Sequence, residues 1–389
     1  MSPYVRFGLF YTAVFLLLGV QLPFFPVWLE SRGLSEIVIG ATLAAAFSGR
    51  AVFSVAAAYL VDRRLEQRRA LGLIGAGTAA AFAIAGLASH TAVLIAFSIL
   101  AVWLYGTAIP LSDVAAAQAE KRGLLHYGRA RAVGSAAFIL ANLGGGLAVG
   151  RFGAEAVIWW IVAAGAAMAA TAPLLPQAIP ETGDAKDGVA LRAVARLLCQ
   201  RRFLVFLLGV SAVQASHAVY YTFSAIEWSR QGRSDLLIGV LWASGIVVEI
   251  IFFSFSARLT RHFSPAAMLA LGAGGAAARW TATALNPPLA ILFPAQALHA
   301  LTFGATHLAT VYFVREHVPA SLANTAMTVS SSLAIGMAAG LAAFAAAPIY
   351  KSFGALAFLS MSLLGVIGLI AAVALLRGAG GRRASAPQR

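Results

Sequence analysis

The stretch that decides the fold is FFPVWLESRGLSEIVIG at residues 24–40, which returns as FSAIEWSRQGRSDLLIG at residues 223–239. Five positions are identical or chemically similar at one offset of 199 residues (223 against 24), about half of the chain: Gly33/Gly232, Ser35/Ser234, Glu36/Asp235, Ile39/Ile238 and Gly40/Gly239. A repeat at this distance predicts two similar halves. In a chain rich in apolar residues, we therefore expect two similar bundles of membrane helices, an arrangement typical of secondary transporters.

The composition indicates an integral membrane protein. Hydrophobic residues make up 60% of the 389 residues and charged residues 11%, and the mean hydropathy of +0.84 is far above that of a soluble domain. Apolar runs long enough to cross a ~30 Å hydrocarbon core as helices predict spans near residues 7–29, 37–61, 70–89, 92–117, 130–150, 154–175, 203–228, 237–258, 266–285, 289–312, 323–345 and 354–376. The predicted fold class is an all-α membrane protein with twelve transmembrane helices in two pseudo-symmetric six-helix bundles.

These spans divide the chain into four parts. They are an N-terminal six-helix bundle at 1–175, a cytoplasmic linker at 176–202, a C-terminal six-helix bundle at 203–376 and a cytoplasmic tail at 377–389. The first span continues to Trp28 without a small-residue cleavage site, so we expect a membrane helix there instead of a signal peptide. The single cysteine, Cys199, excludes an internal disulfide and a cysteine metal site. The tail sequence GAGGRRASAPQR predicts disorder.

The distribution of charge predicts the orientation in the membrane. Of the 28 Lys and Arg residues, two fall inside predicted spans, Arg50 and Arg279, and five fall in the predicted outer loops, Arg32, Arg151, Arg230, Arg233 and Lys351. The other 21 lie at the ends and loops expected on the cytoplasmic side, which is the positive-inside pattern. We therefore expect a multi-pass protein of the cell inner (cytoplasmic) membrane with both termini in the cytoplasm. The net charge of +14 then reflects orientation and not binding to nucleic acid.

Ionisable side chains inside the membrane are the best functional candidates, because they are costly there. Arg50 lies in the middle of its span, and the offset of 199 residues places Glu249 at the equivalent position of the second half. Glu249 and Arg279 lie equally far from the turn between their helices, so we expect them at one depth. The same arithmetic places Asp113 level with Arg131. The alternative for these charges is structural, a mutual neutralisation of buried groups.

Two of the predicted helices carry stripes of polar and aromatic residues. The members recur at helical spacing: Arg131, Ser135, Phe138 and Asn142 on the fifth span, and Gln214, His217, Tyr220, Tyr221 and Ser224 on the seventh. A mixed face of this kind suits the wall of a cavity better than contact with lipid. The alternative is simple hydrogen bonding between helices.

Several motifs resemble those of known transporters. The basic turn Asp62-Arg63-Arg64 resembles the major facilitator superfamily signature between helices 2 and 3, although Ala57, Ala58 and Tyr59 stand where that family usually has a glycine. More specific are PFFPVWL from Pro23, PLSDVAAAQ from Pro110, YGRARAVGSAAF from Tyr127, QASHAVYYTFSAIEW from Gln214, VVEIIFF from Val247, ARW from Ala278 and ALHALTFGATHLA from Ala297. From Phe10 to about Gly365, the chain resembles the phenylpropionate permease family, which is close to the oligosaccharide/proton symporters typified by lactose permease.

The resemblance implies roles for single residues. Asp113 and Arg131 stand where lactose permease has its sugar-binding carboxylate and arginine, at the same spacing of 18 residues. Three further residues stand at its helix 8 carboxylate, helix 9 arginine and helix 10 histidine, namely Glu249, Arg279 and His299. Thr302 departs from the pattern, because lactose permease has there the glutamate assigned to proton release. Proton coupling would therefore need Glu249 or Asp113.

The function implied by the resemblance is proton-coupled symport of a small aromatic carboxylate by alternating access in the major facilitator fold. The residues expected to bind substrate are Asp113, Arg131, Asn142, His217, Tyr220, Tyr221, Trp242, Arg279, Trp280 and His299. Those expected in proton coupling are Glu249, Asp113 and Arg50, and those expected in gating are Asp62, Arg63, Gly33, Gly40, Gly232 and Gly239. The expected partners are the substrate, protons and membrane lipid. A monomer is the expected working unit, without cofactor, metal or catalytic residue.

Four alternatives stay open at this point. Within transport they are a sugar or nucleoside symporter, which the Asp113 and Arg131 pair favours, and a proton-driven drug exporter. Outside transport they are a membrane-embedded enzyme and a receptor. The sequence contains no HExxH, GxSxG, P-loop or dinucleotide motif, and its linker and tail are too short for a catalytic or signalling domain.

Overall fold

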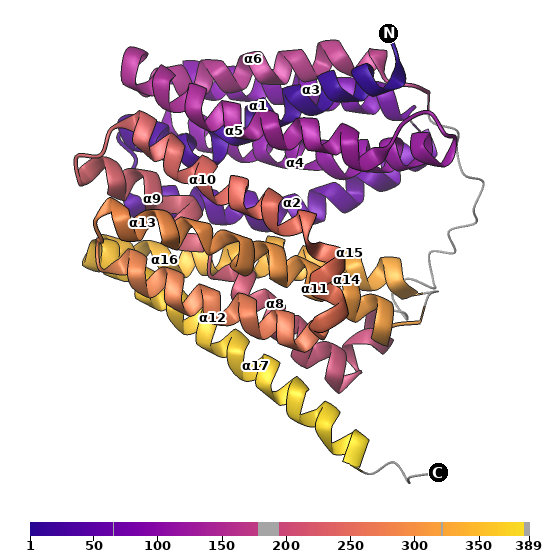
Figure 1. Cartoon of the computed structure of the whole chain (residues 1–389). Helices are drawn as coiled ribbons and strands as arrows, with labels where there is room; N and C mark the ends of the chain where they lie inside the picture. The colour runs from indigo at the N-terminus through magenta and orange to yellow at the C-terminus, as the bar shows by residue number, and fades with distance from the viewer. Residues whose placement is uncertain (65, 178–193, 320–321, 385–389) are drawn as a thin grey trace. The chain divides into compact units, whose positions relative to one another are not determined.

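The computed structural model describes residues 1–64, 66–177, 194–319 and 322–384, and within these ranges the side chains of residues 51, 55, 58–64, 324 and 378–384 are not described. Over the described ranges the chain forms helices and no strand (Figure 1). This confirms the predicted all-α class. Ten helical segments of the described chain are long and apolar enough to cross a membrane, as expected for a multi-pass membrane protein.

The number of membrane spans is ten by this measure. The last of them, Thr325–Arg377, is 53 residues long, more than twice the ~20 residues that cross a bilayer as a helix, and it covers the eleventh and twelfth predicted spans. The ninth predicted span forms α12, Pro265–Ala284, which lies outside the ten. The count of twelve therefore stays a prediction.

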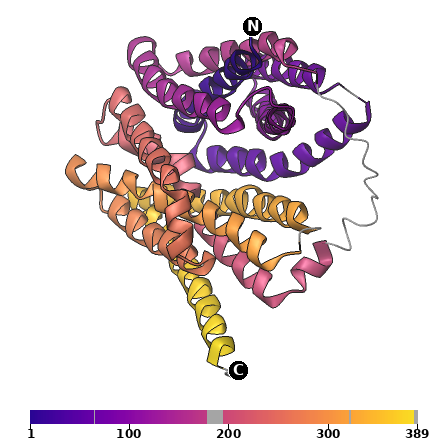
Figure 2. The same cartoon turned by 45° about the vertical axis from the view of Figure 1, so that its right-hand side comes forward.

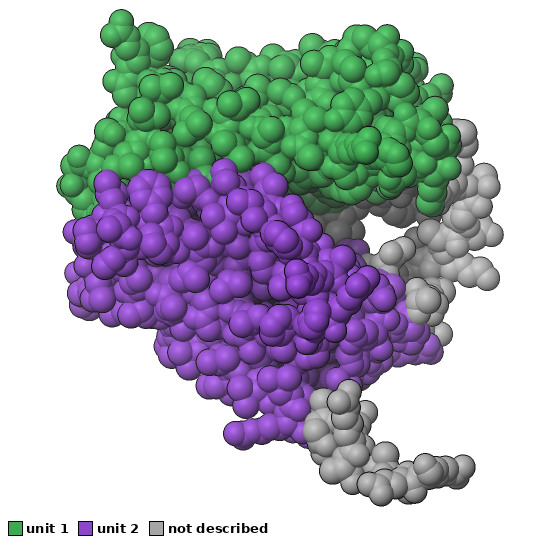
Figure 3. Space-filling view, viewed as in Figure 1, with its two compact units in different colours: residues 1–182, 221–243 green, residues 183–220, 244–389 purple. Residues whose placement is uncertain are grey.

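The first compact unit consists of Met1–Thr182 and Tyr221–Ala243 (green in Figure 3). Its elements are α1 (Pro3–Ser31), α2 (Glu36–Arg64), α3 (Gln67–Leu87), α4 (Thr91–Lys121), α5 (Tyr127–Phe152), α6 (Glu155–Thr171), the short turn η1 (Ala172–Leu174), most of α9 (Ala218–Arg230) and the first part of α10 (Asp235–Ser254). Helix α1 packs against α5 and α6, α3 against α4 and α6, and α2 against α4 (Figures 1 and 2). The predicted division at residues 175 and 203 stays a prediction.

Aromatic rings fill the centre of this first unit. The ring of Phe25 lies 5.5 Å from that of Trp28 and 5.6 Å from that of Phe82, centroid to centroid. Tyr105 lies 6.5 Å from Phe82, and its hydroxyl donates to Oε1 of the buried Gln21 at 2.7 Å. Stacked and edge-on pairs of this kind stabilise a core beyond the area they bury. Rings from α1, α3 and α4 therefore meet in the core of the unit.

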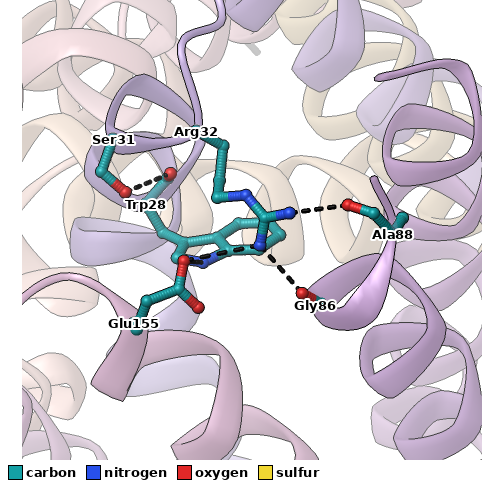
Figure 4. Close-up of polar contacts among 6 residues, drawn as sticks. All are labelled: Trp28, Ser31, Arg32, Gly86, Ala88 and Glu155. Atoms are coloured by element: carbon teal, nitrogen blue, oxygen red, sulfur yellow. Dashed lines mark hydrogen bonds and ion pairs between the residues drawn. The ribbon is translucent and has the colours of Figure 1, made fainter. Parts of the chain in front are cut away.

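A polar brace around Arg32 ties three helices of the same unit together (Figure 4). Arg32 follows α1 and donates to the carbonyl oxygens of Gly86 at 2.8 Å and Ala88 at 2.6 Å, at the end of α3. Its guanidinium carbon lies 5.5 Å from the ring centroid of Trp28, whose Nε1 donates to Glu155 of α6 at 3.2 Å. A cation is favourable at a helix C-terminus, because the last carbonyls there lack helical partners.

The second compact unit consists of Gly183–Tyr220 and Ser244–Arg389 (purple in Figure 3). Its elements are α8 (Arg201–Ala215), α11 (Ser256–His262), α12 (Pro265–Ala284), α13 (Leu289–Ala297), the π-helical turn η2 (Ala300–Ala305), α14 (Thr306–His317), α15 (Ala323–Ser331), the π-helical turn η4 (Ser332–Ala338), α16 (Ala339–Phe353), η5 (Gly354–Ala357) and α17 (Phe358–Ala384). Helix α12 packs against α17, α14 and η2, and α8 packs against α17 and η4.

The repeated stretch forms the same turn in both halves. Gly33 and Gly232 have φ angles of +80° and +76°, and each donates its N–H to the carbonyl three residues earlier, Glu30 or Ser229, at 2.9 Å. This left-handed conformation favours glycine and ends a helix. No heavy atom lies within 4 Å of the place that a Cβ would take at either glycine. The need for glycine at these two predicted gating positions therefore comes from the backbone conformation and not from a close approach of helices.

Several predicted spans are interrupted in the structure. The eighth is broken between α10 and α11, and the eleventh is divided into α15, η4 and α16. Helix α8 ends at Ala215 and α9 begins at Ala218, because two side chains compete for one carbonyl: Ser216 Oγ donates to the oxygen of Val213 at 2.6 Å, and His217 Nδ1 lies 3.2 Å from the same oxygen. Side chains that bond to nearby carbonyls displace the helical N–H donors. The tenth predicted span is likewise divided into α13, η2 and α14.

The tail is more ordered than predicted. Helix α17 continues to Ala384, past Arg377, where the predicted tail begins, so disorder is not found up to that residue.

Candidate functional site

The second unit contains a buried arginine held by three side chains. Arg279 lies on α12 and is 1% exposed. Its Nη1 lies 3.0 Å from Nδ1 of His299 and 3.2 Å from Oγ1 of Thr302, and its Nη2 donates to Oε1 of Gln296 at 2.9 Å. Gln296 lies on α13, Thr302 on η2, and His299 between these two elements. A charge buried this deeply is stable only with such hydrogen bonds.

Aromatic rings flank the same guanidinium. Its carbon lies 4.7 Å from the ring centroid of Tyr220 and 4.4 Å from that of Trp280, within the range of cation–π attraction. Trp280 is held in turn by Ser216, whose hydroxyl accepts from its Nε1 at 2.8 Å. The helix break at Ser216 therefore contributes directly to the arrangement around Arg279.

Glu249 joins this cluster through His299. Its Oε2 lies 3.0 Å from Nε2 of His299, and 15% of its side chain is exposed against 8% for the histidine. The sequence predicted Glu249 and Arg279 at one depth, and the structure links them through the imidazole. Three residues predicted from separate motifs, Glu249, Arg279 and His299, are thus brought together.

The first unit contains a second charged cluster. Arg131 Nε on α5 lies 3.6 Å from Oδ1 of Asp113 on α4, and each side chain is 29% exposed. The hydroxyl of Tyr11 donates to the same oxygen at 2.8 Å. The guanidinium of Arg131 lies 4.2 Å from the ring centroid of Phe15 and 5.8 Å from that of Tyr11. The predicted pair therefore exists as part of a larger, partly exposed group that includes α1.

The repeat relates Arg50 of the first half to Glu249 of the second. Arg50 is half-buried on α2, and its side chain packs against α4 at Gly106, where a Cβ would lie 2.6 Å from its Cγ. In the second half, Cγ of Glu249 lies 3.8 Å from the corresponding place at Gly304 of η2. Each half thus places the charged residue of its second helix against a glycine of its fourth. Whether Arg50 takes part in proton coupling stays a prediction.

The remaining predicted residues lie elsewhere. Asn142 is fully buried, and its amide donates to the carbonyl of Phe138 in its own helix at 2.7 Å. Tyr221 and Trp242 contact one another at 5.9 Å between ring centroids. Asp62 and Arg63 lie in the last turn of α2, and their side chains are outside the described part of the chain.

One of the predicted gating glycines lies where α5 and α10 cross. A Cβ at Gly239 would meet the backbone carbonyl of Asn142, and a Cβ at Gly146 would meet that of Asp235. The two backbones touch because neither glycine has a side chain. Gly40, the repeat equivalent of Gly239, is buried. Gly146 was not predicted, because it stands among several glycines of α5 that the sequence does not distinguish.

An ionic contact lies beside the repeated turns. Nη2 of Arg230, at the end of α9, lies 2.5 Å from Oε1 of Glu30 on α1 and 3.0 Å from Oε1 of Glu36 on α2. One arginine therefore joins the ends of α1, α2 and α9. Its side chain is 46% exposed, so we expect only a modest contribution to stability.

A comparison with protein families matches residues 4–360 to the model of the MFS_1 like family. The chain is 32% identical over 308 residues to a protein of Escherichia coli (strain K12) described as "Probable 3-phenylpropionic acid transporter", which covers 78% of this chain and 80% of that protein. It is 25% identical to the maltose permease of Geobacillus stearothermophilus over 345 residues, 86% of this chain and 84% of that one. These relatives carry the names of transporters and not of enzymes, as predicted.

Solved structures support the same fold. The nucleoside transporter NupG superposes with a TM-score of 0.83 over 97% of this chain and 99% of its own, at 13% identity. A bacterial homologue of the human lysosomal transporter Spinster gives a TM-score of 0.73 over 97% and 96%, at 17% identity. At such identities the likeness concerns the fold alone.

Proposed function

The chain belongs to the MFS_1-like family and is a transporter of the major facilitator type, and from this premise we propose that it carries a small aromatic carboxylate together with a proton by alternating access. The observation that carries the proposal is the flanking of Arg279 by Tyr220 and Trp280. A guanidinium pairs with a carboxylate through two parallel hydrogen bonds, and neighbouring rings pack against an aromatic group. The name of the relative from Escherichia coli supports the same substrate class.

The proposal includes a location and a partner set. We place the protein in the inner membrane with both termini in the cytoplasm, because 21 of the 28 Lys and Arg residues lie on one side of the predicted spans. The transporter works as a monomer surrounded by lipid, with a small molecule and protons as its partners. Each unit contains one arginine beside aromatic rings, Arg131 in the first and Arg279 in the second.

Uptake into proteoliposomes tests this function. We expect saturable uptake of 3-phenylpropionate that increases when the outside is made more acidic than the inside. Protein-free vesicles are the essential control, because the neutral acid crosses lipid unaided. At a pH about three units above a carboxyl pKa of ~4.3, only about one molecule in a thousand is neutral. Uptake no faster than in protein-free vesicles, with or without a pH gradient, contradicts the proposal.

A neutral solute is the second candidate. The Asp113 and Arg131 pair offers acceptor and donor groups side by side, with 29% of each side chain exposed, which suits the hydroxyl groups of a sugar or nucleoside. Maltose and a set of nucleosides therefore belong in the same uptake assay. Competition by one of them, in the absence of competition by aromatic acids, favours this second function.

Arg131→Lys is expected to weaken substrate binding about tenfold while the protein stays folded. A lysine keeps the charge, but it loses the planar fork and most of the stacking on Phe15. Arg129→Lys, on an exposed position of the same helix, is the matched control. The measurement is the dissociation constant in detergent beside the melting temperature. Unchanged affinity in Arg131→Lys assigns the pair to bracing of α4 and α5.

A further inference from the structure

The buried cluster of the second unit is a hydrogen-bonded chain with a defined direction. Arg279 can only donate, because a guanidinium has five N–H groups and no acceptor. Its Nη1 lies 3.0 Å from Nδ1 of His299, so this nitrogen accepts and the proton of the neutral ring is on Nε2. Nε2 lies 3.0 Å from a carboxylate oxygen of Glu249, a close contact outside hydrogen-bond geometry. His299 therefore lies between Arg279 and Glu249, with its proton on the side of the carboxylate.

His217 is in the opposite tautomer. Its Nδ1 lies 3.2 Å from the carbonyl oxygens of both Val213 and Gln214. Carbonyl oxygens only accept, so the proton is on Nδ1. Nε2 is then an acceptor, and the hydroxyl of Thr302, 3.0 Å away, is its donor.

Thr302 lies between His217 and Arg279 and is hydrogen-bonded to both. Its single hydrogen goes to His217, which leaves the lone pairs of Oγ1 for Nη1 of Arg279 at 3.2 Å. The carbonyl of His299 is a longer alternative acceptor for the hydroxyl, at 3.4 Å. The shorter contact to His217 decides the orientation, because hydrogen bonds between nitrogen and oxygen are most favourable near 2.9–3.0 Å.

We propose that Thr302 and His217 are positioning residues for Arg279. His217 accepts the hydroxyl hydrogen of Thr302 and so turns the oxygen toward the guanidinium. Thr302 contacts the guanidinium of Arg279 and His217 contacts Thr302, so both act through Arg279. Glu249 is the most exposed of the residues grouped around Arg279.

The backbone supports a special arrangement at both positions. His217 lies in the break between α8 and α9, and Thr302 lies in the π-helical turn η2. Single π-turns are rare and occur frequently at functional sites. Interruptions of membrane helices also mark binding sites in transporters. The turn η2 places Thr302 against Arg279, and the break after α8 places His217 against Thr302.

The tautomers can be measured directly. The chain has seven histidines, so protein labelled with 15N-histidine and reconstituted in bilayers gives few signals, and His217→Asn and His299→Asn assign the two of interest. At roughly pH 8, above the ordinary histidine pKa of ~6.5, we expect His217 protonated on Nδ1 and His299 on Nε2. The same tautomer at both residues, or a doubly protonated His299, overturns the proposal.

A transport measurement compares Thr302→Val with Thr302→Ser. Valine has nearly the same shape without the hydroxyl, and serine keeps the hydroxyl. We expect the KM for 3-phenylpropionate to rise about 10- to 100-fold in Thr302→Val, which is the effect of losing a hydrogen bond to a charged group. In Thr302→Ser the KM should stay within about twofold of the parent value. The maximal rate should change little in either variant. Equal KM values in both variants overturn the proposal.

The transport measurement rests on the proposed function, whereas the tautomer measurement does not. Absence of 3-phenylpropionate uptake by the parent protein contradicts the proposed substrate and leaves the histidine signals readable. If Thr302→Val does not fold, the signals of the parent protein still decide the proposal. Opposite tautomers support it, and equal tautomers contradict it.

Discussion

We expect Glu249→Gln to abolish accumulation of the substrate driven by a pH gradient and to preserve exchange of substrate across the membrane. Glutamine has the shape of glutamate, so its amide can take the place of the carboxylate, 3.0 Å from Nε2 of His299 in the parent protein. The chain from His299 to Arg279 therefore stays connected. An amide does not gain or lose a proton between the two faces of the membrane, so coupling is lost.

The size of the effect follows from charge balance. One monovalent carboxylate moving with one proton carries no net charge, so the pH difference drives accumulation and the membrane potential does not. Each unit of pH is worth 1.36 kcal/mol, or about tenfold in concentration. We therefore expect roughly tenfold accumulation per pH unit in the parent protein and equal concentrations on both sides in Glu249→Gln.

Two assays on the same proteoliposomes separate coupling from binding. Counterflow into vesicles preloaded with unlabelled substrate measures exchange, and uptake under an imposed pH difference measures coupling. Glu316→Gln, an exposed carboxylate on α14, is the matched control and should resemble the parent protein. Unimpaired uphill uptake by Glu249→Gln would assign the proton to another group, and Asp113 is the next carboxylate to replace.

The sequence predicted the helices well because apolar length is a direct property of the residues. The span predicted at 266–285 is found at Pro265–Ala284, and the one predicted at 130–150 at Tyr127–Phe152. The turn at Gly33 and Gly232 was also recognisable, since a positive φ angle leaves glycine as the favoured residue. These features depend on neighbours in sequence.

The breaks and the partners of the charged residues depend on contacts that sequence patterns do not contain. The break at Ser216 and His217 comes from side chains that bond to a carbonyl of the preceding turn, and neither glycine nor proline marks it. Tyr11 contacts Asp113 from 102 residues away. It stands in a helix that is apolar on all sides, so no contrast between faces distinguished it.

The contacts of Thr302 also could not be predicted from the sequence. The resemblance marked it only as a departure, a residue without the carboxylate expected at its position. Its contacts are with Arg279, 23 residues away, and with His217, 85 residues away. Only the arrangement of α12, η2 and the break after α8 in space shows that the hydroxyl connects them.

Gly239→Trp is expected to hold the carrier open on the side where α5 and α10 cross and to stop net transport. At this crossing a Cβ on Gly239 would already collide with the carbonyl of Asn142, and an indole is far larger. Overpacking of this kind typically costs about 1–3 kcal/mol, which shifts a two-state equilibrium about 5- to 150-fold. Under the proposed orientation, the favoured state is open to the outside, and substrate still binds to it.

Gly146→Trp tests the same crossing from the other helix. Its Cβ would collide with the carbonyl of Asp235, so we expect the same loss of net transport. Gly274→Trp is the matched control, because no atom lies within 4 Å of a Cβ at that position of α12. Transport by this control variant should be close to that of the parent protein.

The labelling rate of a single cysteine reports whether α5 and α10 stay in contact where they cross. Ser224 on α9 is 1% exposed, so Ser224→Cys should react slowly with a membrane-impermeant thiol reagent added from outside. The exposed native thiol is first removed as Cys199→Ser. In this background, Gly239→Trp and Gly146→Trp should accelerate the labelling by the same factor by which they shift the equilibrium toward the open state. Gly274→Trp should leave the labelling rate unchanged. Slow labelling together with normal transport in both Gly239→Trp and Gly146→Trp would place the outer gate elsewhere. The close approach of α5 and α10 would then either persist in these variants or have no role in the transport cycle.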